Sequence, residues 1–175
     1  MTHKLEELAS KAVGTVRAAK ASLDGMSGVF RHLMREHGEA SALLMRIKLS
    51  ADPEMRRELW QEIRAELLAH EQAERLTVYP AFEQNPQIAY IVARHERDAG
   101  DLEDVIEELT KLGVESPDWQ PTLERLVAQV QEHVRDEEEE YFPLADYVFK
   151  ERSDDMLQRF EEAKAKAKKQ LASSP

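Results

Sequence analysis

Long stretches of the sequence repeat their apolar residues with the period of an α-helix, and few residues interrupt them. Only six Gly and seven Pro occur among the 175 residues, and most of them gather in short segments between the periodic stretches. No segment alternates convincingly with the period of two that a half-buried strand shows. We therefore predict four main helices and a shorter one on either side, near residues 3–24, 27–49, 53–79, 85–112, 118–148 and 152–172.

The connections between the four main helices are short, so successive helices should lie antiparallel. A chain of this length builds one sizeable core rather than two. The expected fold is all-α, an up-down-up-down four-helix bundle with extra N- and C-terminal helices. The expected division is an N-terminal flanking helix (1–26), the bundle (27–149) and a C-terminal flanking helix (150–175). The flanking helices would pack on the outside of the bundle or join copies of the chain into a homo-oligomer.

Charge and composition limit the classes of function. The chain has 35 acidic and 24 basic residues and a net charge of -11, which would repel the phosphates of nucleic acid. Its apolar runs are shorter than the roughly 18 residues of a membrane span, and the first residues lack the apolar core of a signal peptide. We therefore expect a cytoplasmic protein without a nucleic-acid or membrane partner. Because the sequence has no Cys, any metal must be bound through nitrogen and oxygen.

Polar residues interrupt the apolar face of each main helix. Each of these helices carries one His at a position expected to face the core, and two of them add a Glu one turn later. The segments HEQAERLTVYP and HVRDEEEEYFP share a His, a Glu four residues on, an aromatic residue nine on and a Pro ten on. They lie on helices that run parallel in the predicted bundle, so their His and Glu should meet at one level. The candidate metal ligands are His37, His70, Glu74, His95, His133 and Glu137.

The chemistry of these side chains favours a metal. Buried imidazoles and carboxylates without partners each cost several kcal/mol, and a pair of metal ions about 3.5–4 Å apart would compensate them. Imidazole and carboxylate without sulfur suit iron, and also zinc or manganese. A single inward His is more often a hydrogen-bonded core residue, and His/Glu pairs are frequent on solvated helix faces. A structural role, with the His and Glu satisfying one another, therefore stays open.

Several neighbouring residues are considered as contacts of the site but are not assigned as metal ligands. His32 lies about 140° around the helix from His37 and should sit at the flank of the bundle. Tyr141 could donate a hydrogen bond to a bound ligand, or simply pack in the core. The other acidic residues of the run at 136–140 should be solvated or contact a ligand from outside, and His3 receives no role. The walls of a pocket for a small ligand are expected from Leu33, Leu67, Ile91, Leu102 and Val130.

Four motifs together resemble the hemerythrin-like family, the HHE cation-binding domains, over about residues 27–148. They are REHGEA, HEQAE followed by YP, ARHERDAGDLEDVIEEL, and HVRDE followed by FP. The resemblance implies a four-helix bundle with two non-haem iron ions that are oxo- or hydroxo-bridged. It implies that Glu74 and Glu137 bridge the irons and that the four His are terminal ligands. The implied partner is a small diatomic ligand or peroxide.

The sequence also departs from the oxygen-carrying hemerythrins. Those proteins have a second His one turn after the His of the third helix, where this chain has Ala99, and their last carboxylate is an Asp five residues beyond its His. One iron would lack a nitrogen ligand unless Asp98, His32 or water replaces it. Such an open site suits reaction with peroxide, O2 or NO better than reversible O2 storage.

The expected function is therefore binding of O2, NO or peroxide, in sensing, storage or a stress response. The alternatives are a catalase-like or peroxidase-like enzyme, an iron-centre repair protein and a structural zinc-binding bundle. The repair role is weakened because the chain lacks the Cys-containing N-terminal segment of those proteins. Whether the protein is an enzyme stays open, and no catalytic residue or organic cofactor is assigned.

Overall fold

The computed structural model is helical along almost its whole length. It describes residues 2–173, and for residues 2–10 and 23 only the course of the chain is described. Within this part of the chain no strand occurs. The elements are α1 (Thr2–Leu23), α2 (Gly28–Leu49), α3 (Pro53–Thr77), α4 (Tyr79–Glu83), α5 (Ala89–Lys111), α6 (Trp119–Asp136), the π-helix η1 (Glu137–Tyr141), α7 (Phe142–Phe149), the 3₁₀ turn η2 (Lys150–Arg152) and α8 (Ser153–Ser173).

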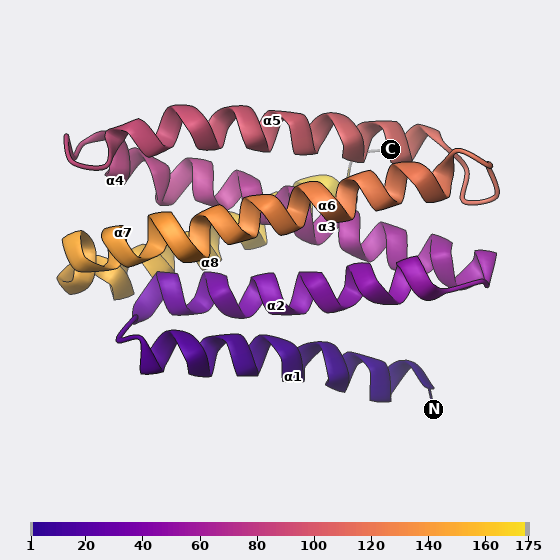
Figure 1. Ribbon diagram of the computed structural model, residues 1–175, viewed down its shortest axis with the longest axis horizontal. Helices are drawn as coiled ribbons and strands as arrows, with labels where there is room; N and C mark the ends of the chain where they lie inside the picture. The colour runs from indigo at the N-terminus through magenta and orange to yellow at the C-terminus, as the bar shows by residue number, and fades with distance from the viewer. Residues whose placement is uncertain (1, 174–175) are drawn as a thin grey trace.

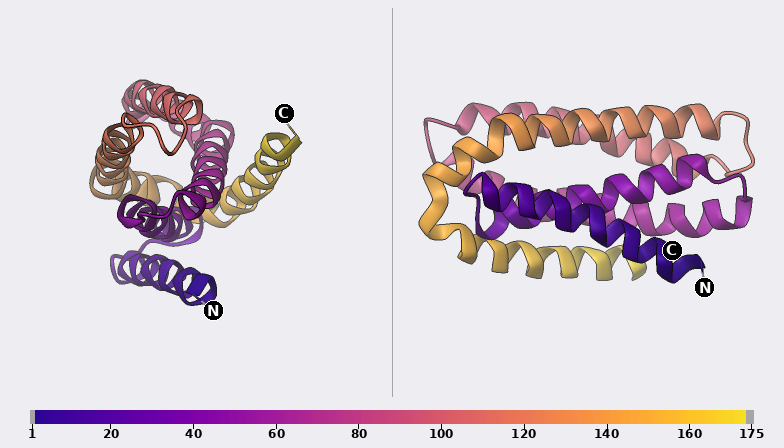
Figure 2. Two further views of the ribbon diagram at one scale, coloured as in Figure 1. Left: turned by 90° about the vertical axis from the view of Figure 1, so that its right-hand side faces the viewer. Right: turned by 60° about the horizontal axis from the view of Figure 1, so that its bottom comes forward.

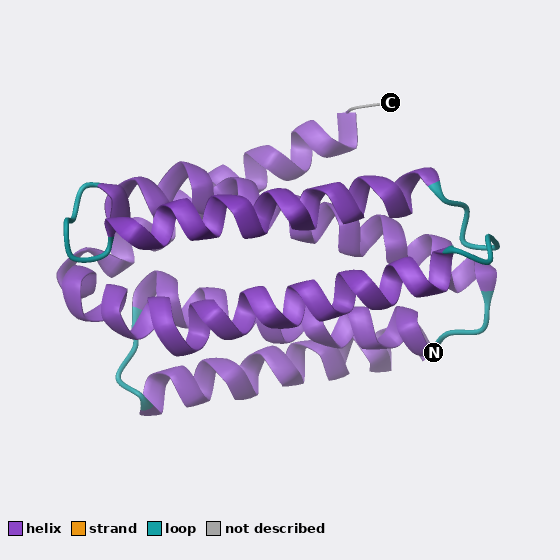
Figure 3. Ribbon diagram, turned by 45° about the horizontal axis from the view of Figure 1, so that its top comes forward, coloured by secondary structure: helices purple, strands orange, loops and turns teal. Residues whose placement is uncertain are grey.

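The helices α2, α3, α5 and α6 form an up-down-up-down four-helix bundle, as predicted (Figure 1). Short loops join them (Figure 3), so neighbours in sequence are antiparallel and α3 runs parallel to α6. The start of α3 shows why the sequence folds this way locally. Asp52 accepts a hydrogen bond from the amide of Glu54 at 3.0 Å, and Pro53 occupies the first turn.

The two flanking helices pack on the outside of the bundle (Figure 2). Helix α1 runs along α2, and α8 covers α3 and part of α2. The α1–α2 crossing is close because Gly14 faces Gly38: a Cβ on Gly38 would lie 2.8 Å from the Cα of Gly14. The flanking helices therefore pack on the outside of the bundle, which is one of the two predicted arrangements. Self-association and the exact domain boundaries stay predictions.

The predicted fourth helix at 118–148 is observed as one helical run over residues 119–149, which a π-turn divides. The α-helix ends at Asp136, one π-turn follows, and α7 begins at Phe142. Because the π-turn adds a residue, the buried face after it consists of Phe142, Ala145 and Phe149, whereas Leu144 is only partly buried. The π-turn begins at Glu137, one of the predicted metal ligands. Such turns often occur at functional sites.

The apolar core consists of two clusters, one toward each end of the bundle. The end at which α1 meets α2 is rich in aromatic residues, among them Phe30, Phe82, Phe142 and Phe160. The opposite end contains Ile47, Leu59, Leu123 and both Trp residues, Trp60 and Trp119. The buried His and Glu residues occupy the level between these clusters. No helix in the described part of the chain is long and apolar enough to span a membrane.

Candidate metal centre

All six predicted ligands are buried at one level of the bundle, where they form two groups. The His37 group consists of His37, His70 and Glu137. The His95 group consists of Glu71, Glu74, His95 and His133. Within each group the nitrogen and oxygen atoms that could bind a metal lie within 4.8 Å of one another. Every main helix contributes, since α2 supplies His37, α5 supplies His95, and the other residues come from α3 and from α6 with its π-turn.

Two carboxylates connect the groups. Glu137 Oε2 lies 3.2 Å from His37 Nε2, while its Oε1 lies 3.4 Å from His95 Nε2 and 3.7 Å from His133 Nε2. Glu74 Oε2 lies 3.4 Å from His70 Nε2 and 3.8 Å from His95 Nε2. Each carboxylate therefore reaches both groups. This is the arrangement needed to bridge two metal ions.

Many polar atoms at this level have no hydrogen-bond partner. The Nε2 atoms of all four His are buried and unpartnered, as are both oxygens of Glu74, Oε2 of Glu71 and Oε2 of Glu137. Each such atom costs about 1–3 kcal/mol when left unsatisfied. Cations placed among them would satisfy them all, so the donor set fits a metal centre.

The family comparison agrees with this geometry. Residues 28–145 match the family model "Hemerythrin HHE cation binding domain". The chain belongs to this family. A search of curated proteins and a search of solved structures each return no match. The resemblance inferred from the sequence motifs is thereby confirmed, and the protein contains an HHE cation-binding domain whose buried His/Glu clusters can hold metal.

Sequence reasoning missed Glu71 of the HHE domain. Its Oε1 lies 3.0 Å from His133 Nε2, and its Oε2 lies 3.6 Å from His95 Nε2. The signal was present, because the i, i+3, i+4, i+7 spacing of a core-facing helix is met by Leu67, His70, Glu71 and Glu74. Neither Asp98 nor His32 belongs to either group, whereas Glu71 offers an additional oxygen atom to the His95 group; water, the third alternative, stays open.

Carboxylates outside the two groups orient two of the imidazoles. His37 Nδ1 donates to Glu138 Oε1 at 3.1 Å, and His70 Nδ1 donates to Glu36 Oε2 at 2.8 Å. These bonds fix the tautomer that leaves Nε2 free for a metal. His32 donates to the same Glu36 carboxylate at 3.0 Å, which places it at the flank of the domain as predicted.

The aromatic residues that follow the two repeated His/Glu motifs also contact the centre. Tyr79 stacks on His95 with ring centroids 3.6 Å apart, and its hydroxyl donates to Glu137 Oε1 at 2.6 Å. Phe142 stacks on His37 with centroids 5.7 Å apart. The hydroxyl of Tyr141 is buried without a hydrogen-bond partner, so its bond to a bound ligand stays a prediction.

Burial and neighbouring charges shift the pKa values of the carboxylates and of the Tyr79 hydroxyl in the centre. Burial and the charge of Glu137 raise the pKa of Glu74 well above its ordinary value. For Glu137 burial also raises the pKa, but the charge of His133 and the nearby imidazoles of His37 and His95 outweigh this effect and hold the pKa well below the ordinary value. Burial together with the Glu137 charge raises the pKa of Tyr79, so its hydroxyl stays protonated as a donor. Protons and His charges thus compensate the carboxylates where no cation does.

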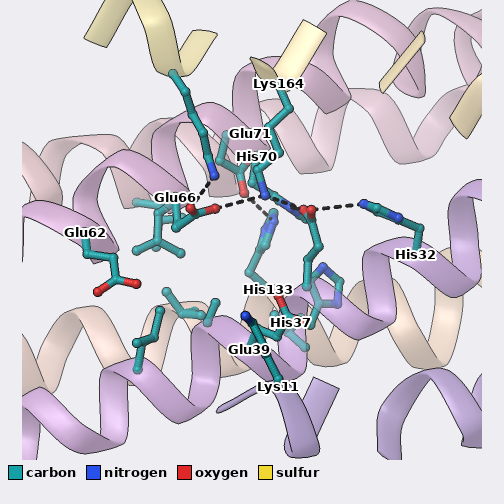
Figure 4. Close-up of a pocket in the computed structure, with 18 of the residues that line it drawn as sticks. Lys11, His32, His37, Glu39, Glu62, Glu66, His70, Glu71, His133 and Lys164 are labelled. Atoms are coloured by element: carbon teal, nitrogen blue, oxygen red, sulfur yellow. Dashed lines mark hydrogen bonds and ion pairs between the residues drawn. The ribbon is translucent and has the colours of Figure 1, made fainter. Parts of the chain in front are cut away.

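A cavity of about 710 Å³ reaches the centre from the side covered by α8 (Figure 4). At its inner end lie His37, His70, Glu71 and His133. Of the predicted wall residues, Leu67, Leu102 and Val130 line it. The prediction is wrong for Leu33 and Ile91, which belong to the aromatic-rich cluster. Charged residues including Glu62, Glu66 and Lys168 surround the outer part.

Proposed function

We propose that this HHE domain holds two iron ions and binds O2, NO or peroxide at them, in sensing, storage or a stress response. The observation that carries the proposal is that Glu74 and Glu137 each reach both groups of candidate ligands. His37 and His70 would complete one metal position, and His95, His133 and Glu71 the other. Imidazole and carboxylate donors without sulfur suit iron. Two redox-active iron ions, when bound, supply the electrons that O2, NO or peroxide chemistry requires.

The two positions would differ in the number of protein ligands. With one oxygen from each bridging Glu, the His37 group offers four ligand atoms and the His95 group five. The cavity also reaches His37 and His70, so a small ligand has a route to the position with fewer protein ligands. Leu67, Leu102 and Val130 give this route an apolar wall, which limits water at its inner end.

Iron-dependent peroxide consumption is the second candidate. The same cavity favours it, because an incompletely coordinated position that peroxide can reach through a cavity suits turnover better than protected storage. Tyr79 would then hold Glu137 in place through its 2.6 Å hydrogen bond. Disproportionation of peroxide by the iron-loaded protein, absent from the zinc-loaded protein, would support this candidate over ligand binding alone.

The location and the partners belong to the same proposal. We expect the protein to act in the cytoplasm with a small ligand and without nucleic acid or membrane. Light scattering in solution tests whether the flanking helices also mediate self-association.

Metal analysis of protein purified without added metal, together with its visible spectrum before and after anaerobic reduction, tests the proposed function. Close to two irons per chain, with a spectrum that changes on exposure to air, NO or peroxide, is the expected result. Zinc, or no metal even after anaerobic loading with ferrous iron, would contradict it and leave the buried His and Glu with a structural role.

A further inference from the structure

Each flanking helix directs a cationic side chain to a carboxylate beside the centre. From α1, Arg17 Nη1 donates to Glu138 Oε1 at 2.6 Å. From α8, Lys164 Nζ donates to Glu36 Oε2 at 2.6 Å, and Figure 4 shows this lysine beside His70. Both cations lie outside residues 28–145, the segment that matches the HHE family.

The carboxylate oxygens that accept from these cations are the ones that hold the imidazoles. Glu138 Oε1 accepts from both Arg17 and His37 Nδ1. Glu36 Oε2 accepts from both Lys164 and His70 Nδ1. Each of the two histidines is thus linked through one oxygen atom to a cation on a different flanking helix.

Both histidines belong to the His37 group, and the His95 group is connected differently. The Nδ1 atom of His95 is buried without a hydrogen-bond partner. Among the side chains that the structure describes, Glu71 and Glu74 form ion pairs with histidines and not with Lys or Arg. The hydrogen bonds from the flanking helices therefore reach the His37 group and not the His95 group, among the side chains that the structure describes.

We propose that Arg17 and Lys164 are positioning residues for the metal ion held by the His37 group, so that α1 and α8 are functional parts of the metal centre. This inference rests on the proposed function, because it requires a metal at each group. The two metal positions would then differ. Only residues of the bundle would hold the ligands of the His95 group, whereas the flanking helices would also hold the ligands of the His37 group.

The physical reason is the state of the two carboxylates. The side chain of Glu36 is 13% exposed and that of Lys164 11%, so their charges face each other with little water between them. A buried carboxylate that loses its cation pays a large desolvation cost. Glu36 lines the cavity and would turn toward the water there, which withdraws the acceptor from His70 Nδ1. His70 would then no longer be held with its Nε2 toward the metal.

Helix packing holds the cations in position. The Gly14–Gly38 contact fixes α1 against α2 one turn before Arg17. Lys164 also contacts Glu66 Oε2 at 3.1 Å, and Lys168, one turn further along α8, pairs with the other oxygen of Glu66. Lys168 is thus a matched control, since it lies on the same helix and joins α8 to α3 without contacting a carboxylate that holds a histidine.

The test compares metal binding by full-length Lys164→Met, Arg17→Met, Lys164→Arg and Lys168→Met with the wild type. Ferrous iron and Co²⁺ are titrated anaerobically against a chelator, and the cobalt absorption spectrum is recorded at each step. We expect two binding events in the wild type. In Lys164→Met and in Arg17→Met, the metal affinity of one event should fall about tenfold, the lower end of the range found when a metal ligand loses its hydrogen-bond partner. Lys164→Arg should keep the wild-type affinity at both positions, and Lys168→Met should bind both metals as tightly as the wild type.

The outcomes separate this inference from the proposed function. A wild-type protein that binds no pair of metals overturns both. Two metals bound with unchanged affinity in Lys164→Met and Arg17→Met overturn the role of the flanking helices alone. Equal weakening of both metals, or the same effect in Lys168→Met, would show a general loss of packing and also overturn it. Arg17 is 31% exposed, so its substitution also tests the idea where misfolding is not expected.

Discussion

Glu71 lies where it would replace a metal ligand that α5 does not supply. Helix α5 offers only the methyl group of Ala99 one turn after His95, and α3 directs Glu71 toward His95 and His133 instead. An additional carboxylate in place of an imidazole makes the site more negative and favours harder, more highly charged cations.

Substitution of Glu71 tests its role as a ligand. We expect Glu71→Ala to weaken binding of one metal ion by at least tenfold, because the His95 group loses an oxygen ligand while the His37 group keeps its set. Metal titration by calorimetry measures the change, and Gln72→Ala, at an exposed position of the same helix, is the control. Wild-type affinity for both metals in the variant would remove Glu71 from the ligand set.

The hydroxyl of Tyr79 should contribute to stability even without metal. Tyr79→Phe keeps the ring on His95 but removes the hydrogen bond to Glu137, which is buried and charged. A loss of about 1.5–3 kcal/mol in the free energy of unfolding is expected from a hydrogen bond of this kind. Urea denaturation of the metal-free protein measures it. Tyr90→Phe, at an exposed tyrosine, should change stability little, and an equal effect of both substitutions would argue against the bond.

At the scale of helices, the close crossing of α1 and α2 determines where Arg17 lies. Gly38 leaves room for the backbone of Gly14; Gly14 lies three residues before Arg17 on α1, and Gly38 directly follows His37 on α2. A side chain at this crossing would move α1 away from the bundle.

Gly38→Ala is therefore expected to destabilise the protein by about 1–3 kcal/mol, because its Cβ would lie 2.8 Å from the Cα of Gly14. Gly100→Ala is the matched control within α5, where a Cβ meets nothing within 4 Å. At Gly100 the higher helix propensity of Ala should stabilise the folded protein by about 0.5–1 kcal/mol. Thermal unfolding followed by circular dichroism measures both, and equal effects at the two glycines would refute the close contact.

Helical periodicity predicted the bundle well, and local interruptions caused the errors. The expected helices at 27–49 and 152–172 agree closely with Gly28–Leu49 and Ser153–Ser173. The π-turn could not be predicted, because EEEEY contains only one apolar residue to reveal a change of phase. The contact of Tyr79 with the centre was not predicted, because Pro80 suggested a helix end, whereas the chain continues through α4.

Contacts between distant segments were also beyond sequence reasoning. His37, His70, His95 and His133 could be found because a histidine on an apolar stripe is conspicuous. Arg17 and Lys164 lie in charged amphipathic helices, where nothing distinguishes them from their neighbours. Their partners, Glu138 and Glu36, are 121 and 128 residues away in sequence, so only the folded chain identifies them.

For the molecule as a whole, the stability of the metal-free state should depend on pH through His133 and Glu71. Burial lowers the pKa of His133, but the charges of Glu71 and Glu137 outweigh it and raise the pKa from 6.5 to about 10. The stabilisation of the folded state by protonated His133 is fully present below pH 6.5 and is lost as the pH rises through about 10. The pKa of Glu71 is lowered from 4.5 to about 2, mainly by His133 against the effect of burial. Its contribution is present above pH 4.5 and is lost as the pH falls through about 2.

We expect urea denaturation of the metal-free protein to give a lower free energy of unfolding at pH 10 than at pH 6. His133→Gln should reduce this difference, which separates the pair from the general effect of rising negative charge. An unchanged pH dependence in the variant would contradict the assignment. Metal affinity should change in the opposite sense and rise with pH, since a metal must displace the proton of His133.

The polar level between the two apolar clusters has a consequence for cooperativity. Both Trp residues, Trp60 and Trp119, lie in one cluster, so tryptophan fluorescence reports that end of the bundle alone. Without metal, the ends are joined through a layer of unpartnered polar atoms. We expect fluorescence and circular dichroism to give separate unfolding transitions for the metal-free protein and coincident ones after metal is bound. The ions would then turn two separately melting halves into one folding unit.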